Sequence, residues 1–138
     1  MTSQSRIEVH TAGHRDMQDL TAAVAGAVRA SGVTAGTAHV FVVGSTAAVG
    51  AIELEPGLAR DLPELLDRLM PPSRSYGHEQ AWHDGNGHSH LQATALGPSL
   101  SVPVTRGEPA LGTWQQIVLV ECDTRPRERT VVVTVTGE

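Results

Sequence analysis

The sequence predicts an α+β fold with a mixed or antiparallel sheet and three helices. Apolar residues recur at strand and helix spacing, and the predicted elements follow in the order β-α-β-β-α-α-β-β-β. Short turns rich in glycine, proline and charged residues join the last three strands, as in antiparallel hairpins. No linker, internal repeat or low-complexity tract divides the chain, so we expect a single domain over residues 1–138.

The first strand is expected at residues 6–11, where Ile7 and Val9 alternate with polar neighbours. A helix should follow, with Asp16 as its cap and the glycine after Ser31 as its end.

Two further strands are expected at residues 36–43 and 47–55, separated by Gly44-Ser45-Thr46. Residues 40–43 are all apolar, which is typical of a strand covered on both faces.

The second helix is expected at about residues 58–70, with leucines along its buried face. Asp61 and Glu64 have the spacing of a capping box, which would start the regular helix at Asp61. The third helix is expected at about residues 90–96, capped by Ser89. Three strands complete the chain, at residues 101–105, 111–122 and 129–136.

Composition excludes several classes of protein. The net charge of −5 and the four aromatic residues argue against a nucleic-acid partner. No run of about 18 apolar residues could span a membrane, and no apolar signal region follows the start. The single cysteine, Cys122, excludes an intrachain disulfide and a multi-cysteine zinc site. We therefore expect a cytoplasmic protein with neither a nucleic-acid nor a membrane partner.

Residues 76–91 hold four of the seven histidines and are the richest segment in groups that bind metals or transfer protons. The cluster comprises His78, Glu79, His83, Asp84, His88 and His90. Three interspersed glycines let the backbone turn tightly and bring these side chains together. The segment could hold a metal, a proton-transfer group or both; the alternative is a polar surface loop that is rich in histidine.

A zinc site is one chemistry that this segment allows. Around a helix cap at Ser89 the backbone is not yet helical, so His88 and His90 could converge. A third ligand would come from His78 or His83. Three neutral imidazoles leave one coordination position open, which is the pattern of catalytic zinc. Nearby carboxylates, Asp61 among them, could orient a ligand through its second ring nitrogen.

Other polar residues have two interpretations each. Ser45 and Thr46 follow an apolar strand and could hold a phosphate oxygen, or they could form an ordinary turn. Glu53 could be a general base if it is buried, or a solvent-facing carboxylate. Trp114 is expected in the core and Cys122 as a packed thiol, whereas the three arginines of residues 125–129 are expected to be solvated.

A set of motifs resembles the YjbQ family, which is labelled secondary thiamine-phosphate synthase. The motifs are Gly112-Thr113-Trp114-Gln115, the preceding residues 96–104 and Gly107, Tyr76-x-His78, Ser89-His90-Leu91, Asp61 and Thr136-Gly137-Glu138. The match covers nearly the whole chain and is strong from Phe41 onward.

This resemblance implies a two-layer, sandwich-like α+β core with three helices, a homotrimer, and a site near the subunit interfaces. It also implies weak thiamine-phosphate synthesis, in which a thiazole phosphate displaces pyrophosphate from a pyrimidine diphosphate. A small phosphorylated metabolite is therefore the expected partner. A divalent metal, zinc or alternatively magnesium, would neutralise charge on the leaving pyrophosphate.

One segment departs from the family pattern. Many members carry a histidine directly before the two hydroxyl residues, where this chain has Gly44. We hypothesise that His88 replaces that imidazole and completes a metal site with His78 and His90. Asp61 and Glu53 are then the acid–base or support candidates. The alternatives are a metal-dependent hydrolase of a small phosphorylated metabolite and a non-enzymatic trimer that binds a metal or metabolite.

Overall fold

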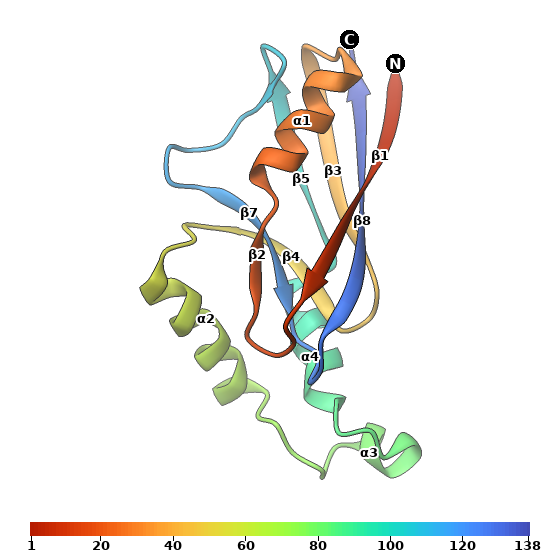
Figure 1. Ribbon diagram of the computed structural model, residues 1–138, viewed down its shortest axis with the longest axis vertical. Helices are drawn as coiled ribbons and strands as arrows, with labels where there is room; N and C mark the ends of the chain where they lie inside the picture. The colour runs from red at the N-terminus through yellow and green to blue at the C-terminus, as the bar shows by residue number, and fades with distance from the viewer.

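A computed structural model covers residues 1–138 and contains two antiparallel sheets and four helices (Figure 1). The first sheet has the strand order β1 (Thr2–Thr11), β8 (Arg127–Gly137), β3 (Ala35–Val43), β5 (Ser99–Thr105) and β6 (Glu108–Pro109). The second has the order β2 (Met17–Asp19), β7 (Gln116–Glu121) and β4 (Ala47–Ile52). The helices are α1 (Thr21–Ser31), α2 (Pro56–Leu69), α3 (Gly77–Trp82) and α4 (Gly87–Leu96). The predicted α+β class is confirmed, and the short α3 is an additional helix.

The main core lies between the two sheets and α1. Sixteen buried residues form it, and most of them are valines. In β8 the inward positions are Val131, Val133 and Val135, because alternate side chains of a strand point to the same face. Val24 and Val28 of α1 are completely buried against this layer. The core therefore consists mainly of short, branched side chains that pack closely between paired strands.

The outer face of the second sheet is covered by α2 and α4. Val118 and Val120 of β7 pack there against Leu66 of α2 and Ala93 of α4. Because the intervening β7 residues enter the main core, residues 117–120 are buried on both faces. A strand covered on both faces was instead expected at residues 40–43.

The outward face of β3 is not covered in this way. Phe41 is 40% exposed and Val43 is 54% exposed, whereas Val40 and Val42 are completely buried. The prediction that residues 40–43 form a strand covered on both faces is therefore wrong, because no helix packs over this side of the first sheet.

Three helix starts differ from the expected positions. In α1 the first turn begins after Asp19, whose carboxylate accepts a hydrogen bond from the Thr21 backbone N–H at 2.9 Å. In α2 the cap is Glu55, which accepts from the N–H of Gly57 at 2.8 Å, and a proline follows it. The predicted caps Asp61 and Ser89 both lie inside helices, because α2 and α4 begin earlier than expected.

The segment before β7 is a turn rather than a strand. Gly112 and Gln115 close it, with the Gln115 N–H donating to the Gly112 carbonyl at 3.1 Å. This turn leaves Trp114 72% exposed, so the prediction that Trp114 belongs to the core is wrong. Cys122, by contrast, is buried as expected.

None of the helices combines the length and apolar character needed to traverse a bilayer.

Candidate functional site

A charged pocket lies where the β3–β4 turn, the α3–α4 segment and the start of β8 meet. Its lining comes from residues 44–46, 78–90 and 123–129, and its volume is about 460 Å³. We call it the polar pocket. Its size lies within the range of small-molecule sites. The fold thus joins the Gly44-Ser45-Thr46 turn to the histidine-rich segment, which the sequence alone could only suggest.

The β3–β4 turn depends on a glycine. Gly44 has φ +154°, a conformation that side chains with a Cβ rarely adopt. A Cβ at this position would lie 2.7 Å from Nη1 of Arg129. The guanidinium group therefore occupies space that a side chain would need. This is the position at which the resemblance places a histidine in many family members.

A buried ion pair forms the floor of the polar pocket. Glu121 is 1% exposed and Arg129 is 6% exposed. Arg129 Nε donates to Glu121 Oε1 at 2.8 Å, and Arg129 Nη2 donates to Thr46 Oγ1 at 2.8 Å. The expectation that the arginines of residues 125–129 are all solvated is wrong for Arg129, because it shares the inward face of β8 with Val131 and Val133.

A second carboxylate, Asp123, extends this network. It accepts from Thr46 Oγ1 at 2.8 Å and from Arg127 Nε at 2.9 Å. Burial by itself would raise the pKa of Asp123. The hydrogen bonds from the Thr46 hydroxyl, the Thr124 backbone and Arg127 outweigh that effect and lower the pKa to about 2. Asp123 is therefore a fixed negative charge at neutral pH.

Three groups of the histidine-rich segment could bind a cation: His78 and Asp84 line the polar pocket, and the buried Glu79 lies beside them. One ligand atom from each of His78, Glu79 and Asp84 lies within 4.8 Å of the other two. His78 Nε2 is 2.9 Å from Asp84 Oδ1, yet their geometry is not that of a hydrogen bond, and this buried nitrogen has no other partner. Glu79 Oε1 accepts from the Gly87 N–H, whereas its buried Oε2 is also unpaired. Unpaired nitrogen and oxygen atoms in this arrangement fit a divalent cation.

His90 also lines the polar pocket. Its ring lies 4.5 Å from the His78 ring, centroid to centroid, at an interplanar angle of 51°. The structure therefore brings together two of the three imidazoles that were expected to form the metal site.

His88 lies elsewhere. It is 2% exposed and packs edge-to-face against His14, with ring centroids 5.3 Å apart. Burial lowers the pKa of His88, and His14 lowers it further. Because α4 begins at Gly87, positions 88 and 90 are both helical and point roughly 200° apart. The expected convergence of His88 with His90 required a later helix start.

The remaining predicted site residues fall into two groups. Ser45 is exposed and lines the polar pocket, while Thr46 is buried with its hydroxyl already bonded at both sides. Glu53 is exposed and lines a separate pocket beside Trp114. Asp61 is exposed on α2 and faces only Arg60, at 3.7 Å. The structure places neither carboxylate at the polar pocket.

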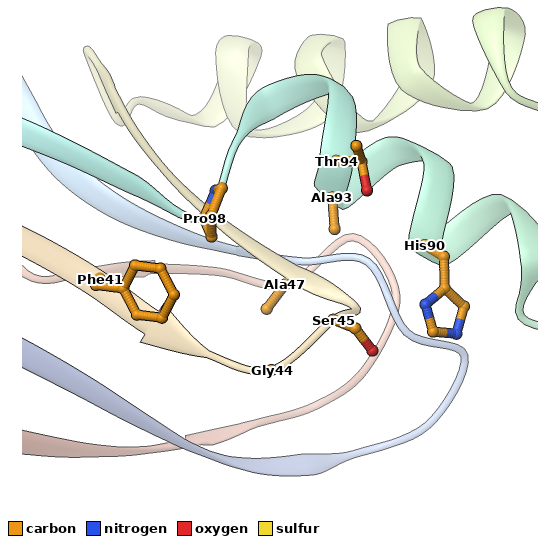
Figure 2. Close-up of a pocket in the computed structure, with 8 residues that line it drawn as sticks. All are labelled: Phe41, Gly44, Ser45, Ala47, His90, Ala93, Thr94 and Pro98. Carbon is orange, nitrogen blue, oxygen red and sulfur yellow. The ribbon is translucent and has the colours of Figure 1, made fainter.

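An adjoining pocket of about 560 Å³ shares Gly44, Ser45 and His90 with the polar pocket. We call it the apolar pocket. In Figure 2, His90 and its neighbours on α4 face the β3–β4 turn, and Phe41 and Pro98 line the far end. A charged compartment therefore meets a largely apolar one at Gly44, Ser45 and His90.

Comparisons with known proteins agree with this architecture. A family model described as "UPF0047 protein YjbQ-like" matches residues 5–138. A UPF0047 protein of Methanothermobacter thermautotrophicus is 38% identical over 132 residues, which cover 96% of this chain and 90% of the relative. The Mycobacterium tuberculosis UPF0047 protein Rv2556c is 40% identical over 125 residues, covering 91% of each chain. A crystal structure of a YbjQ-like protein of unknown function from Sulfolobus solfataricus has a TM-score of 0.89 at 36% identity, over 100% of both chains. This chain is therefore a member of the YjbQ-like UPF0047 family.

Proposed function

We propose that the polar and apolar pockets together bind small phosphorylated metabolites and form thiamine phosphate from a thiazole phosphate and a pyrimidine diphosphate. The observation that carries this proposal is the junction of the two pockets at Gly44, Ser45 and His90. Each compartment is large enough for a ring or a diphosphate. The charged compartment suits the phosphate groups, and the apolar one suits a heteroaromatic ring.

The reaction needs positioning and charge stabilisation. The thiazole nitrogen attacks the methylene carbon of the pyrimidine, a C–N bond forms, and the C–O bond to the diphosphate breaks with its electron pair leaving on pyrophosphate. Arg129 Nη1 lies at the Gly44 turn and makes no hydrogen bond within the chain. With the Ser45 hydroxyl it can donate to phosphate oxygens. Because the ion pair with Glu121 holds the guanidinium in place, this stabilisation is preorganised.

A divalent metal fits the wall formed by His78, Glu79 and Asp84, as the unpaired His78 Nε2 and Glu79 Oε2 indicate. The nitrogen and oxygen donors suit zinc, with magnesium as the alternative. When bound, such an ion would neutralise negative charge on a leaving pyrophosphate. His90 lies beside His78 and is a further ligand or a phosphate contact.

Hydrolysis of a small phosphorylated metabolite is the second candidate. The observation that favours it is that the Asp84 side chain is 52% exposed. Water can therefore reach the group formed by His78, Glu79 and Asp84, which we call the cation wall. Such a substrate would need the polar pocket alone.

Metal content of the untagged protein tests the cation wall. We expect near-stoichiometric zinc in the parent protein and loss of zinc in His78→Ala and Asp84→Asn. His10→Ala is the matched control, because His10 is an exposed histidine on the first sheet. Full zinc retention in both wall variants would refute the metal part of the proposal.

A substitution at Thr94 can distinguish the two candidate reactions. Thr94 is an exposed residue that lines the apolar pocket. A Thr94→Trp substitution would fill this pocket, and Thr94 does not line the polar one. Thiamine-phosphate synthesis, followed by the fluorescence of the oxidised product, should then be lost. If the parent protein forms no thiamine phosphate but hydrolyses glycerol 3-phosphate equally well with and without Thr94→Trp, the hydrolase is the correct reading.

A further inference from the structure

A third pocket lies on the other side of the first turn of α4. It has a volume of about 360 Å³, and His14, Ser73, Arg74, His88 and Thr124 line it. We call it the His14–His88 pocket. The β1–β2 turn that carries His14 lies beside α4 in Figure 1. None of its side chains belongs to the chemistry proposed above.

This pocket shares a wall with the polar pocket. Asp84 lines the polar pocket and the next residue, Gly85, lines the His14–His88 pocket. In the same way, Asp123 lines the polar pocket and the next residue, Thr124, lines the His14–His88 pocket. The two pockets therefore lie back to back across the α3–α4 loop and the β7–β8 loop.

We propose that the His14–His88 pocket is a second binding site, which takes a phosphate group or an oxyanion of similar size.

The first observation is the buried Nδ1 of His88, which has no hydrogen-bond partner in the chain. Buried polar atoms in folded proteins nearly always have a partner. His88 is 2% exposed and lines the pocket, so its ring is held there without a hydrogen bond inside the chain that would compete with a ligand.

The second observation is the charge of Arg74. Its Nη1 donates to the His83 carbonyl at 3.3 Å, and no carboxylate pairs with it. Gly85 permits this placement, because a Cβ there would lie 2.9 Å from Cζ of Arg74. An arginine held by a backbone carbonyl above a pocket keeps its other N–H groups free for an oxyanion.

No carboxylate lines the pocket, and the nearest ones are already engaged. Asp67 accepts from His14 Nε2 at 2.8 Å and from Gln92 Nε2 at 2.9 Å. Glu79 accepts from the Gly87 N–H through Oε1, and its unpaired Oε2 lies within reach of His78 and Asp84. With the hydroxyls of Ser73 and Thr124, the pocket offers mainly donors.

A cation fits this pocket poorly. Both nitrogens of His14 are engaged, Nε2 with Asp67 and Nδ1 with the Cys122 carbonyl at 3.3 Å. Of the two histidines, only His88 has ring nitrogens without a hydrogen-bond partner, and the charge of Arg74 would repel a metal. The donor set therefore favours an oxyanion.

Titration of the full chain with inorganic phosphate, followed in amide NMR spectra, tests the proposal. We expect the Gly85 and Thr124 signals to shift on binding. Arg74→Ala should weaken this binding roughly tenfold or more, because it removes a charged donor. Thr124→Val should weaken it less. Both residues are exposed, so neither change should disturb folding.

Two controls separate this site from the polar pocket. Arg68→Ala removes an exposed arginine of α2 that makes no ion pair and should leave phosphate binding unchanged. His78→Ala alters only the polar pocket and should leave the Gly85 and Thr124 shifts intact. Phosphate binding in Arg74→Ala equal to that of the parent protein would overturn the proposal, as would shifts that appear with zinc alone and not with phosphate.

Glycerol 3-phosphate identifies the source of the oxyanion. Tighter binding of the ester than of inorganic phosphate would assign the pocket to the phosphate end of a metabolite. Equal binding would assign it to the free ion. The failure of zinc binding or of thiamine-phosphate synthesis in the polar pocket would leave this result unchanged.

Discussion

Replacing Glu121 by glutamine should lower the free energy of unfolding by about 3–5 kcal/mol, the typical cost of breaking a buried ion pair on one side. Glu121 accepts four hydrogen bonds, from Thr11 Oγ1, the Asp123 N–H, and Nε and Nη2 of Arg129. An amide would replace one of its oxygens by a donor that faces donors. Arg129 would then keep its charge in a buried position without a counter-charge.

Urea unfolding followed by circular dichroism at neutral pH measures this loss. Glu108→Gln is the matched control, because Glu108 also pairs with an arginine but is half exposed, and we expect it to change stability far less. A double variant, Glu121→Leu with Arg129→Met, should recover most of the loss, since apolar side chains can replace a buried pair with little cost.

The reasoning would be refuted by a Glu121→Gln loss below about 1 kcal/mol, which is the range of a solvated pair. Such a result would mean that water in the polar pocket hydrates Arg129 fully. The guanidinium would then not be the preorganised phosphate contact on which the proposed function relies.

Three further results are expected. The unfolding free energy should fall as the pH drops from about 4 toward 2, because the pKa of Asp123 is about 2 in the folded chain against an ordinary 3.8; its stabilisation is complete above the higher value and is lost as the folded carboxylate protonates. Asp123→Asn should flatten this part of a pH series of urea titrations. Cys122 should not react with a disulfide reagent at pH 8 in the native protein, because burial raises its pKa to about 12; rapid native labelling would contradict this. Light scattering should give about three times the 14.5 kDa chain mass if the trimer that the family resemblance implies forms; Trp82 and Trp114, each more than 70% exposed, would suit its contacts, and a monomer would contradict this.

Much of the fold follows from periodicity in the sequence. Val131, Val133 and Val135 recur at every second position, and this spacing predicts that they share one face of β8, which is the buried one. The same alternation, extended backward, places Arg129 on the inward face. This alternation is the sequence signal that could have predicted the burial of Arg129. The charge pattern alone suggested a solvated turn. Backbone geometry determines these local patterns, so they can be recognised in the sequence without knowing which strands pair with β8.

The candidate site was predictable only in part. The density of histidines pointed to a segment that lines the polar pocket, and the resemblance identified the family. The grouping of the imidazoles depends on where α4 begins, because one turn of helix sends His88 and His90 to opposite pockets. Helix ends are the least certain boundaries in a sequence, since caps compete within a few residues.

The sequence by itself determined the α+β class, the alternating core strands and the location of the histidine-rich segment. The tertiary structure alone decided that Arg129 and Glu121 pair beneath that segment, and that His78 meets Asp84 while His88 meets His14. The physical reason is that alternation and helical spacing are properties of a few consecutive residues. Pairing across sheets and loops depends instead on strand register and on packing between segments far apart in the chain.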